Sequence, residues 1–574
     1  MKNKIQENAH VFLGFALGVG WLCAIGTTYR MVPVGSYQPS MIFNIISAFF
    51  LLVFFINRKI FIFAYSASAW VFLFILILLQ PILHKGFAYQ DALIYPMGAM
   101  LLAFFVHSAI ASLDEEEKKS TFRIIVIFII AAALVTTLSQ WLQWTIPYGE
   151  ISKYLVYPLR SGYTAYGNIG QRNEAAYINT LGIIALFYIS SGTPKNIQKL
   201  IISSLALFLA SGVALSGSRG AVVLLFLTVA VFSIEVILTK KHEIKFLLFF
   251  ALLIIFGYLL GLFIFEKYNY LHHALNAIEY AKSARGHLRV SLLKQAAGMF
   301  LDNPLFGQGW KSFAYYGLRN FNAIDWYAYS DNSHFFLSMI AAEFGLLGFL
   351  SIAPVCFYTF RSIINPRKFF SSGIKSCSFG LMAITLAYSC YDFPLWYVYY
   401  FIMFVGCLAF MLDNDKRISL SFDFSKLAVP ASAVALAFCS WSFYTFIDIS
   451  SIEYIMAKKN LTEKEKLGLI ADTKFAYGQS RYQELYLFST MPLSNDNLAD
   501  RLDMGRRVTS SFASEELFVK QAVLLALNKE KDESLFMFNA ACKINDGVDC
   551  NNVKSTVKEL IQNYPAYFLH MKDF

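Results

Sequence analysis

Long apolar runs separated by short polar loops fill the chain from Val11 to Phe446. Runs of roughly 17–25 apolar residues are long enough to cross a bilayer as helices. The pattern therefore predicts an all-α polytopic membrane protein with about thirteen transmembrane helices. The predicted spans are Val11–Tyr29, Met41–Ile56, Phe61–Gln80, Ala92–Leu113, Phe122–Trp144, Ala175–Ser191, Leu200–Leu215, Ala221–Leu238, Phe246–Phe265, His334–Phe360, Gly373–Tyr391, Leu395–Leu412 and Leu427–Phe446.

Two stretches depart from this pattern. One is a polar and aromatic segment that ends just before His334, and the other is a charged tail whose apolar residues, such as Leu517 and Ala522, recur at helical spacing. We therefore expect four parts, which are N-terminal transmembrane helices at 1–265, a large catalytic loop outside the membrane at 266–333, C-terminal transmembrane helices at 334–447 and a helical domain outside the membrane at 448–574.

Composition and charge agree with a membrane protein. Hydrophobic residues make up 57% of the chain and charged residues 15%, whereas soluble domains carry about 25% charged residues. The net charge of +10 is compatible with nucleic-acid binding, but Lys and Arg of membrane proteins collect in cytoplasmic loops. We expect the lipid bilayer as a partner and no nucleic acid.

The basic residues also predict an orientation. They concentrate in alternate short loops, while the loops between them hold few, such as Arg30, Lys85 and Arg219. By the positive-inside rule the N-terminus is cytoplasmic, so the large loop and the tail face outward. The first apolar segment also lacks a signal-peptide cleavage site. The predicted cytoplasmic loops hold Arg58, Lys59, Lys118, Lys119, Lys195, Lys199, Lys240, Lys241, Lys245, Arg361, Arg367, Lys368, Lys416, Arg417 and Lys426.

The cysteines follow the same division. Cys542 and Cys550 lie in the tail, and the other six fall in predicted spans. If the tail faces an oxidising compartment, these two cysteines form a disulfide that closes a short loop. The alternative is that their spacing is accidental.

Three cationic or titratable groups are candidates for chemistry on the outer side. Arg219 lies in a turn with small neighbours on both sides, which leave room for a ligand; an arginine reaching to lipid headgroups is the alternative. Arg285 and Arg289 share one helix face, and their planar forks suit phosphate oxygens, although a solvated helix would look the same. His334 at a helix start is either a proton acceptor or a structural cap.

Other polar residues carry less weight. Gln171, Arg172 and Asn173 precede a span and offer donors for a sugar or phosphate, or they cap that span. Asp392 lies in an outer hairpin and either orients a base or caps a helix. Glu343 lies within a span, where a buried ion pair or hydrogen bond is a better explanation than catalysis. The loop aromatics either stack on sugars or form an interfacial belt, and they are Tyr315, Tyr316, Phe321, Trp326, Tyr327 and Tyr329.

No motif for a bound cofactor is present in the sequence. There is no H-E-x-x-H pattern or other metal-site spacing, and no nucleotide-binding motif. We therefore expect no metal and no cofactor. The energy for a reaction must then come with the substrate, which indicates an activated donor.

Several motifs in order resemble the O-antigen ligase (Wzy_C) superfamily. These are Ser216-Gly217-Ser218-Arg219-Gly220, Arg289 followed by Asp302-Asn303-Pro304-Leu305-Phe306-Gly307-Gln308-Gly309-Trp310, Asn332-Ser333-His334-Phe335-Phe336-Leu337 and Glu343-Phe344-Gly345-Leu346-Leu347-Gly348. Upstream, Gly167-Asn168-Ile169-Gly170-Gln171-Arg172-Asn173 is similar to a segment that marks the protein O-oligosaccharyltransferases of the PglL type. The departure from the family lies in the residues beside His334, which are Ser333 and Phe335.

The resemblance implies a metal-independent transfer of an oligosaccharide from an undecaprenyl-pyrophosphate carrier on the periplasmic face of the bacterial inner membrane. His334 would deprotonate the acceptor hydroxyl, and Arg219 and Arg289 would stabilise the pyrophosphate. Gln171 and Asn173 would help to bind donor or acceptor, and we include Arg172, Arg285 and Asp392 with them as substrate-binding candidates.

The acceptor divides the superfamily. A protein ligase modifies Ser or Thr of exported proteins such as pilins, an O-antigen ligase uses lipid A-core, and a polymerase uses a second lipid-linked glycan. The Gln171–Asn173 segment and the outward tail favour the protein ligase. A lipid-linked glycan flippase is the reading from a different class, but it predicts internal repeats and polar residues at mid-membrane depth, which the sequence lacks.

Overall fold

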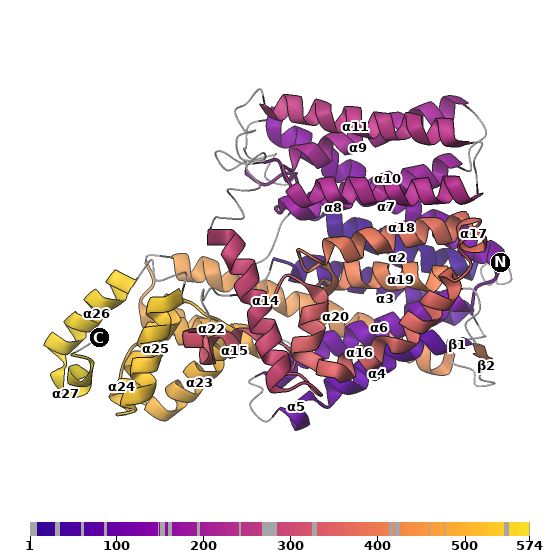
Figure 1. Ribbon diagram of the computed structural model, residues 1–574. Helices are drawn as coiled ribbons and strands as arrows, with labels where there is room; N and C mark the ends of the chain where they lie inside the picture. The colour runs from indigo at the N-terminus through magenta and orange to yellow at the C-terminus, as the bar shows by residue number, and fades with distance from the viewer. Residues whose placement is uncertain are drawn as a thin grey trace. The chain divides into compact units, whose positions relative to one another are not determined.

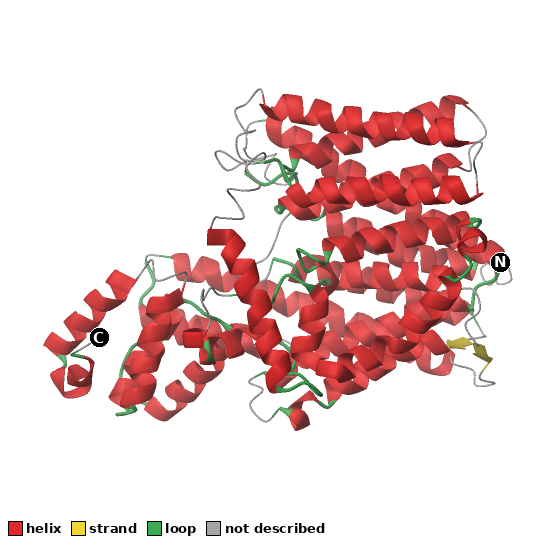
Figure 2. Ribbon diagram, in the orientation of Figure 1, coloured by secondary structure: helices red, strands yellow, loops and turns green. Residues whose placement is uncertain are grey.

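The structure is a computed structural model of the 574-residue chain. It describes residues 8–28, 35–58, 62–84, 89–146, 149, 155–158, 164–191, 196–239, 243–266, 284–323, 330–412, 417–419, 425–458, 460–475, 477–544, 550–572 and 574. The described chain is almost entirely helical, and one short ladder joins β1 (Ile62–Ala64) to β2 (Arg417–Ser419) in antiparallel register, with Phe63 opposite Ile418 (Figure 2).

Each predicted span overlaps a helix, although the span predicted at Phe61–Gln80 also contains β1 and η1 (Tyr65–Ala67). Within the described residues, 9 helices are long and apolar enough to cross a membrane. The remaining predicted spans fall on α4 (Ser68–Leu78) and α19 (Val398–Met411), which are apolar but shorter, on α8 (Arg172–Ser191), and on the 16-residue α18 (Gly373–Tyr388). The chain is thus a polytopic α-helical membrane protein, whereas the number thirteen and the orientation stay predictions.

The Cα positions divide the chain into two compact units. Unit 1 contains residues 1–71, 99–277 and 352–440, and unit 2 contains residues 72–98, 278–351 and 441–574. Four helices contribute residues to both units, and these are α4 (Ser68–Leu78), α6 (Ile94–Ala111), α16 (Phe336–Ile363) and α20 (Ser425–Ala457).

Unit 1 is a bundle of membrane helices in which both sequence neighbours and helices further apart in the sequence pack against each other (Figure 1). Close packing of α9 and α11 depends on glycine, because a Cβ atom on Gly257 would lie 2.3 Å from the carbonyl oxygen of Leu207. Small residues allow membrane helices to approach in this way. The elements of unit 1 are α2 (Ala9–Gly26), α3 (Tyr37–Asn57), β1, η1 (Tyr65–Ala67), α7 (Glu115–Thr145), α8 (Arg172–Ser191), α9 (Asn196–Leu215), α10 (Arg219–Thr239), α11 (Ile244–Glu266), α17 (Pro366–Phe370), α18 (Gly373–Tyr388), η6 (Pro394–Trp396), α19 (Val398–Met411) and β2.

Unit 2 joins the segment 284–323 to the C-terminal tail. The tail is an array in which each helix packs against the next, as its apolar spacing predicts. Leu318 and Phe321 belong to the same buried cluster as Phe518 and Phe538 of the tail. The elements of unit 2 are α5 (Gln80–Leu83), η2 (Gln90–Leu93), α14 (Ala284–Asp302), α15 (Phe313–Arg319), η5 (Phe321–Ala323), α21 (Glu463–Ala471), α22 (Ser480–Thr490), α23 (Leu498–Ser511), α24 (Glu515–Leu527), α25 (Lys531–Lys543), α26 (Cys550–Asn563), α27 (Pro565–Phe568) and η8 (Leu569–Met571).

Unit 2 contains an association between the loop and the tail that the predicted division into four parts does not include. The segment 284–323 shares a hydrophobic core with the tail, and α20 continues to Ala457 beyond the predicted end at Phe446. The four parts, which were defined by membrane topology, stay a prediction.

Candidate functional site

In unit 1, three of the predicted substrate-binding residues meet. The buried carboxylate of Asp392 accepts hydrogen bonds from Gln171 Nε2 at 3.0 Å and from Asn173 Nδ2 at 3.4 Å. Asp392 also accepts from the hydroxyl of Tyr388 and from the backbone N–H of Phe393, each at 3.0 Å. A buried carboxylate needs donors of this kind, so Asp392 is held by four groups.

Gln171 and Asn173 have structural partners on both ends of their amides. The Oε1 atom of Gln171 accepts from the N–H of Glu174 at 2.5 Å and so caps the first turn of α8. The Oδ1 atom of Asn173 accepts from the hydroxyl of Ser218 at 2.8 Å. Gln171 is therefore a cap of α8, which is the alternative that the sequence left open for this segment, while Arg172 is exposed.

Asn173 thereby fixes the turn that carries Arg219. Within this turn Gly217 has a φ of +56°, a conformation that favours glycine. A Cβ atom on Gly220 would lie 2.4 Å from the ring of Tyr391, so a side chain there would require that ring to move. The predicted tight turn is present, and half-buried Arg219 begins α10 beside Ser218.

Polar residues of α7 that sequence reasoning did not single out hold the segment before α8. Gln143 Oε1 accepts from the N–H groups of Tyr166 and Gly167 at 2.9 and 2.8 Å. Gln140 Nε2 donates to the carbonyls of Ala165 and Gly212 at 2.9 and 3.0 Å. The available signal was two glutamines one helical turn apart near the end of an apolar span, where polar groups need partners.

In unit 2, two of the sequence motifs dock onto each other. Helix α16 is interrupted at Gly345, whose φ and ψ are 60° and −151°. The freed backbone groups pair with the segment before α15, because Leu346 N donates to Pro304 O at 2.8 Å and Gly309 N donates to Glu343 O at 3.0 Å. The two segments approach so closely that a Cβ atom on Gly307 would lie 2.4 Å from the carbonyl carbon of Glu343.

Glu343 lies at this junction. Its Oε1 atom accepts a hydrogen bond of 2.9 Å from the backbone N–H of Lys311, and its side chain is completely buried. The prediction of a buried structural hydrogen bond for Glu343 is therefore confirmed.

His334 stands just before the first turn of α16 in an unusual backbone conformation. Its φ is +57°, and its N–H donates to the side-chain oxygen of Asn332 at 3.0 Å. Left-handed conformations of this kind in a residue with a side chain occur mostly at turns and functional sites. The backbone thus fixes the direction in which the half-buried imidazole leaves the chain.

An ion pair lies close to His334 in the sequence. Lys311 Nζ is 2.9 Å from Asp331 Oδ2. The positive charge of Lys311 is the main reason why the pKa of Asp331 is lowered to about 2. Asp331 also accepts from Asn332 Nδ2 at 2.7 Å, so the ion pair and the anchor of His334 are directly connected.

The two arginines predicted on one helix face both belong to α14. Arg289 is exposed, as a group that meets a ligand at the surface would be. The side chain of Arg285 lies outside the described residues. Unit 1 thus brings Gln171, Asn173 and Asp392 to the turn of Arg219, and unit 2 carries His334 and the arginines of α14.

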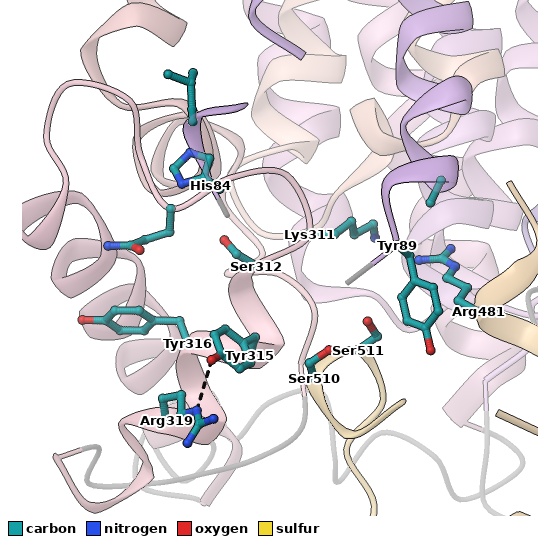
Figure 3. A pocket seen from close by; sticks show the side chains of 13 residues that line it. His84, Tyr89, Lys311, Ser312, Tyr315, Tyr316, Arg319, Arg481, Ser510 and Ser511 are labelled. Carbon is teal, nitrogen blue, oxygen red and sulfur yellow. Dashed lines mark hydrogen bonds between the residues drawn. The ribbon is translucent and has the colours of Figure 1, made fainter. Parts of the chain in front are cut away.

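Unit 2 also contains a cavity of about 380 Å³. Figure 3 shows Tyr89 and Arg481 on one side and Tyr315, Tyr316 and Arg319 on the other. The lining comes from the chain before α6, from the segment around α15 and from the tail. The lining residues are Leu83, His84, Tyr89, Ala92, Gln308, Lys311, Ser312, Tyr315, Tyr316, Arg319, Arg481, Ser510 and Ser511.

The aromatic residues of the loop have different surroundings. Tyr315 and Tyr316 line this cavity, whereas Phe321 is buried against the tail, with its ring centroid 5.1 Å from that of Phe536. Phe321 is therefore a core residue, and both the sugar-stacking and the interfacial interpretations are wrong for it. Trp326, Tyr327 and Tyr329 lie outside the described residues.

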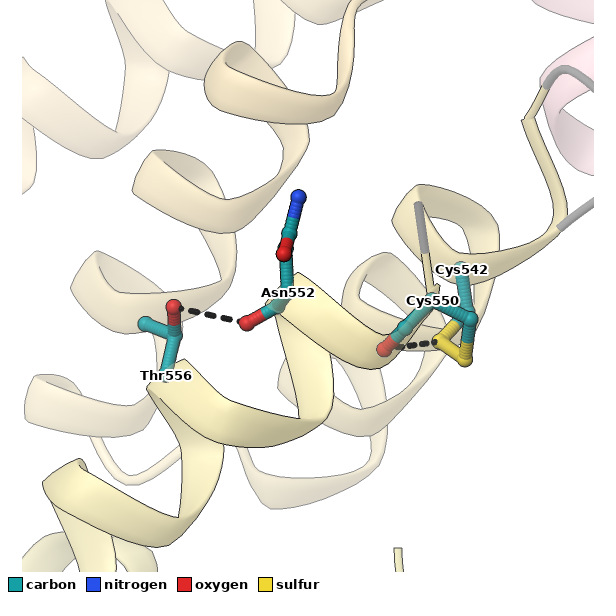
Figure 4. The surroundings of a disulfide bond; sticks show 4 residues. All are labelled: Cys542, Cys550, Asn552 and Thr556. Atoms are coloured by element: carbon teal, nitrogen blue, oxygen red, sulfur yellow. Dashed lines mark hydrogen bonds between the residues drawn. A yellow bond between two sulfur atoms is a disulfide. The ribbon is translucent and has the colours of Figure 1, made fainter. Parts of the chain in front are cut away.

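The predicted disulfide between Cys542 and Cys550 is present and links the end of α25 to the start of α26 (Figure 4). No group of three or more His, Cys, Asp or Glu side chains in the described ranges could hold a metal ion. That the reaction needs no metal or other cofactor stays a prediction.

The long apolar helices and the paired polar residues at their ends define a multi-pass α-helical membrane protein with a candidate site in each unit. Residues 204–353 match the family model described as O-antigen ligase, Wzy_C. This part of the chain is therefore a domain of the O-antigen ligase family, as the motifs predict, and it contains Arg219, Arg289 and His334. Gln171–Asn173, Asp392 and the tail lie outside the match. Comparison with curated proteins and with solved structures gave no match.

Proposed function

We propose that this protein is a membrane glycosyltransferase of the bacterial inner membrane that works on the periplasmic face. It moves an oligosaccharide en bloc from undecaprenyl pyrophosphate to Ser or Thr hydroxyls of exported proteins such as pilins. The observation that carries the proposal is His334, which a left-handed backbone and Asn332 fix at the start of α16 inside the O-antigen ligase domain.

The proposed reaction needs one base and a stabilised leaving group. The acceptor hydroxyl attacks the anomeric carbon, its proton passes to His334, and the bond between that carbon and the pyrophosphate oxygen breaks. Undecaprenyl pyrophosphate leaves with the electron pair, and the guanidinium groups of Arg219 and Arg289 stabilise its charge. No metal is required by this scheme.

Gln171, Asn173 and Asp392 act as positioning residues in this proposal. They contact one another, and Asn173 holds the turn of Arg219 through Ser218. Their effect on transfer would thus pass through the position of Arg219.

The acceptor is a protein in our proposal because the chain carries a helical tail of a size suited to recruiting one. Ligation to lipid A-core, or polymerisation of a lipid-linked glycan, is the second candidate, and the description of the matched family as O-antigen ligase favours the ligation.

A pair of variants at position 334 tests the base. His334→Asn keeps a residue type that tolerates a positive φ, whereas His334→Ala removes the base and adds backbone strain. We expect both to abolish transfer, since neither side chain accepts a proton at neutral pH, and the Asn variant to keep wild-type expression and thermal stability.

The assay is glycan staining of exported proteins in a deletion strain that expresses each variant, together with lipopolysaccharide ladders. Loss of protein glycan with intact lipopolysaccharide supports the protein ligase. Loss of the ladders in the deletion strain, with restoration by the wild-type gene, would instead identify the ligase to lipid A-core or the polymerase. Full transfer by His334→Asn would remove His334 from the mechanism.

A further inference from the structure

Two residues with left-handed backbones lie at the ends of one series of polar contacts in unit 2. Within the described residues four non-glycine residues have a positive φ, and two of them are Lys311 at +62° and His334 at +57°. The ammonium group of Lys311 pairs with Asp331. Asp331 accepts a hydrogen bond from Asn332, whose side-chain oxygen accepts from the N–H of His334. Backbones of this kind persist only where their surroundings hold them, and they cluster at functional sites.

We propose that Asp331 and Asn332 are positioning residues of the transfer reaction, because together they set the place of the His334 imidazole. These two residues are called the positioning pair below. Lys311 keeps the carboxylate of the pair in place. The proposal deepens the proposed function and rests on it, since it takes His334 to be the base.

The carboxylate of Asp331 divides its two oxygens between two partners. Its Oδ2 atom lies 2.9 Å from Nζ of Lys311, and its Oδ1 atom accepts from Nδ2 of Asn332 at 2.7 Å. The charge of Lys311 is the main cause that lowers the pKa of Asp331 to about 2, and the charge of Arg481 acts in the same direction. Asp331 is therefore ionised at neutral pH, and an ionised carboxylate only accepts hydrogen bonds.

Both neighbours of Asn332 impose the same orientation on its amide. An amide side chain has a donating NH2 end and an accepting oxygen. Asp331 can only accept and the backbone N–H of His334 can only donate, so the NH2 faces Asp331 and the oxygen faces His334. A reversed amide would bring two acceptors together at Asp331 and two donors together at His334. Because Asn332 is buried, such mismatches are costly.

The interior of α16 holds Lys311 from the other side. The backbone N–H of Lys311 donates to Oε1 of Glu343 at 2.9 Å, two residues before the break at Gly345. Lys311 is thus held at its backbone by α16 and at its ammonium group by Asp331. This arrangement ties the residues that precede α16 to the middle of the same helix.

The position of a base matters more for turnover than for binding. The imidazole must reach the acceptor hydroxyl within hydrogen-bond distance. A rotation of about 10° at the backbone of His334 moves the far ring nitrogen by about 1 Å, and a displacement of this size costs up to about 100-fold in rate. In our scheme Arg219 and Arg289 contact the pyrophosphate of the donor, so loss of the positioning pair should lower kcat and leave KM unchanged.

Asp331→Asn is the first test, because the new side chain has nearly the same size. The variant has one accepting oxygen, so either Lys311 or Asn332 meets an NH2 group instead. Transfer is measured with purified full-length protein, a lipid-linked oligosaccharide extracted from the deletion strain, and the exported proteins that lack glycan in that strain. We expect kcat to fall about 10–100-fold, with KM for donor and acceptor within about twofold of wild type.

Lys311→Met separates the ion pair from the orientation of Asn332. This variant removes the ammonium group but leaves the hydrogen bond between Asn332 and Asp331. We expect a thermal stability like that of Asp331→Asn and a kcat within about threefold of wild type, since a partly exposed ion pair contributes little. An equal loss of kcat in the two variants would show that only the ion pair matters and would overturn the proposal.

The matched control is Glu530→Gln in the tail. The carboxylate of Glu530 has the same kinds of partner as Asp331, because it pairs with Arg506 through Oε2 and accepts from Nδ2 of Asn528 at 2.6 Å through Oε1. It is not connected to His334 by any described hydrogen bond. We expect wild-type kcat from this variant. If Asp331→Asn has the same kcat as Glu530→Gln, the positioning pair is refuted.

Failure of this proposal can be told apart from failure of the proposed function. Normal turnover by Asp331→Asn beside an inactive His334→Asn variant would reject the positioning pair alone. Full transfer by His334→Asn would reject the base. If the wild-type protein transfers glycan to lipid A-core rather than to exported proteins, the acceptor proposal is wrong, and the same variants are compared on that acceptor, because its hydroxyl needs the same base.

Discussion

Replacement of Gly345 by alanine tests whether the break in α16 holds the segment before α15. An alanine there would adopt a φ of 60° and a ψ of −151°, which costs about 1–3 kcal/mol for a residue with a side chain. Its Cβ atom would also lie 2.6 Å from Pro304 O and 2.7 Å from Gly307 N, both of them backbone atoms. Relief of that overlap costs about another 1–3 kcal/mol.

We therefore expect Gly345→Ala to lower the free energy of unfolding by about 2–6 kcal/mol. The assay is the temperature at which detergent-purified protein loses its monodisperse elution peak, measured together with glycan transfer. We expect a decrease of about 2–5 °C for a chain of this length and reduced transfer, because the chain around His334 leads directly into α16.

The matched control is Gly98→Ala. Gly98 lies within α6, another apolar helix, and apart from its chain neighbours and the adjacent backbone of α6 no atom lies within 4 Å of the position of an added Cβ. This substitution should be neutral or stabilising by up to about 1 kcal/mol, since alanine is the better helix former. If Gly345→Ala is as stable as Gly98→Ala, the described docking of the two motifs is refuted.

Three further predictions follow from the hydrogen bonds, ion pairs and covalent links. Asp392→Asn should lower the free energy of unfolding by about 1–3 kcal/mol and reduce transfer, because the N–H groups of the new amide would face the donors of Gln171 or Phe393. An unchanged melting temperature would contradict this prediction. The low pKa of Asp331, about 2, means that its pairing with Lys311 stabilises unit 2 above about pH 4 and that this stability is lost as the pH falls toward 2. Because the side chain of Asp331 is 46% exposed, we expect a contribution of about 1 kcal/mol or less, and Lys311→Met should flatten this part of the acid-unfolding curve measured by tryptophan fluorescence. The double variant Cys542→Ser, Cys550→Ser should destabilise the tail by about 2 kcal/mol and make its trypsin digestion insensitive to reducing agent; equal digestion of reduced and oxidised wild-type protein would argue against a stabilising disulfide.

Hydropathy located the membrane helices well because each apolar run can only satisfy its backbone as a helix. The pattern could not reveal that α16 is interrupted at Gly345, since the residues on both sides are mostly apolar. The break becomes visible only when Pro304 and Gly309 supply hydrogen bonds from a distant part of the sequence. The motifs were therefore found, but their contact with each other was not.

The same distinction holds for the candidate site. Gln171, Asn173 and Asp392 were selected as substrate ligands by residue type, whereas their hydrogen bonds are to one another and to Ser218. Residue type indicates hydrogen-bonding capacity but not the partner. Arg481 was not selected because it lies far along the chain from the loop, and only the packing of unit 2 brings it to the cavity of Lys311 and Arg319.

The interrupted helix also constrains how new specificities can be engineered. The segment 304–309 supplies the hydrogen bonds that the backbone of α16 lacks around Gly345, and the N–H of Lys311 adds one to the side chain of Glu343. Unpaired backbone groups in a membrane helix cost several kcal/mol each, so a chimera that receives a foreign loop on its native α16 should misassemble. The loop and residues 342–347 must therefore be exchanged together. A substitution in one of these two segments is tolerated only with a matching substitution in the other.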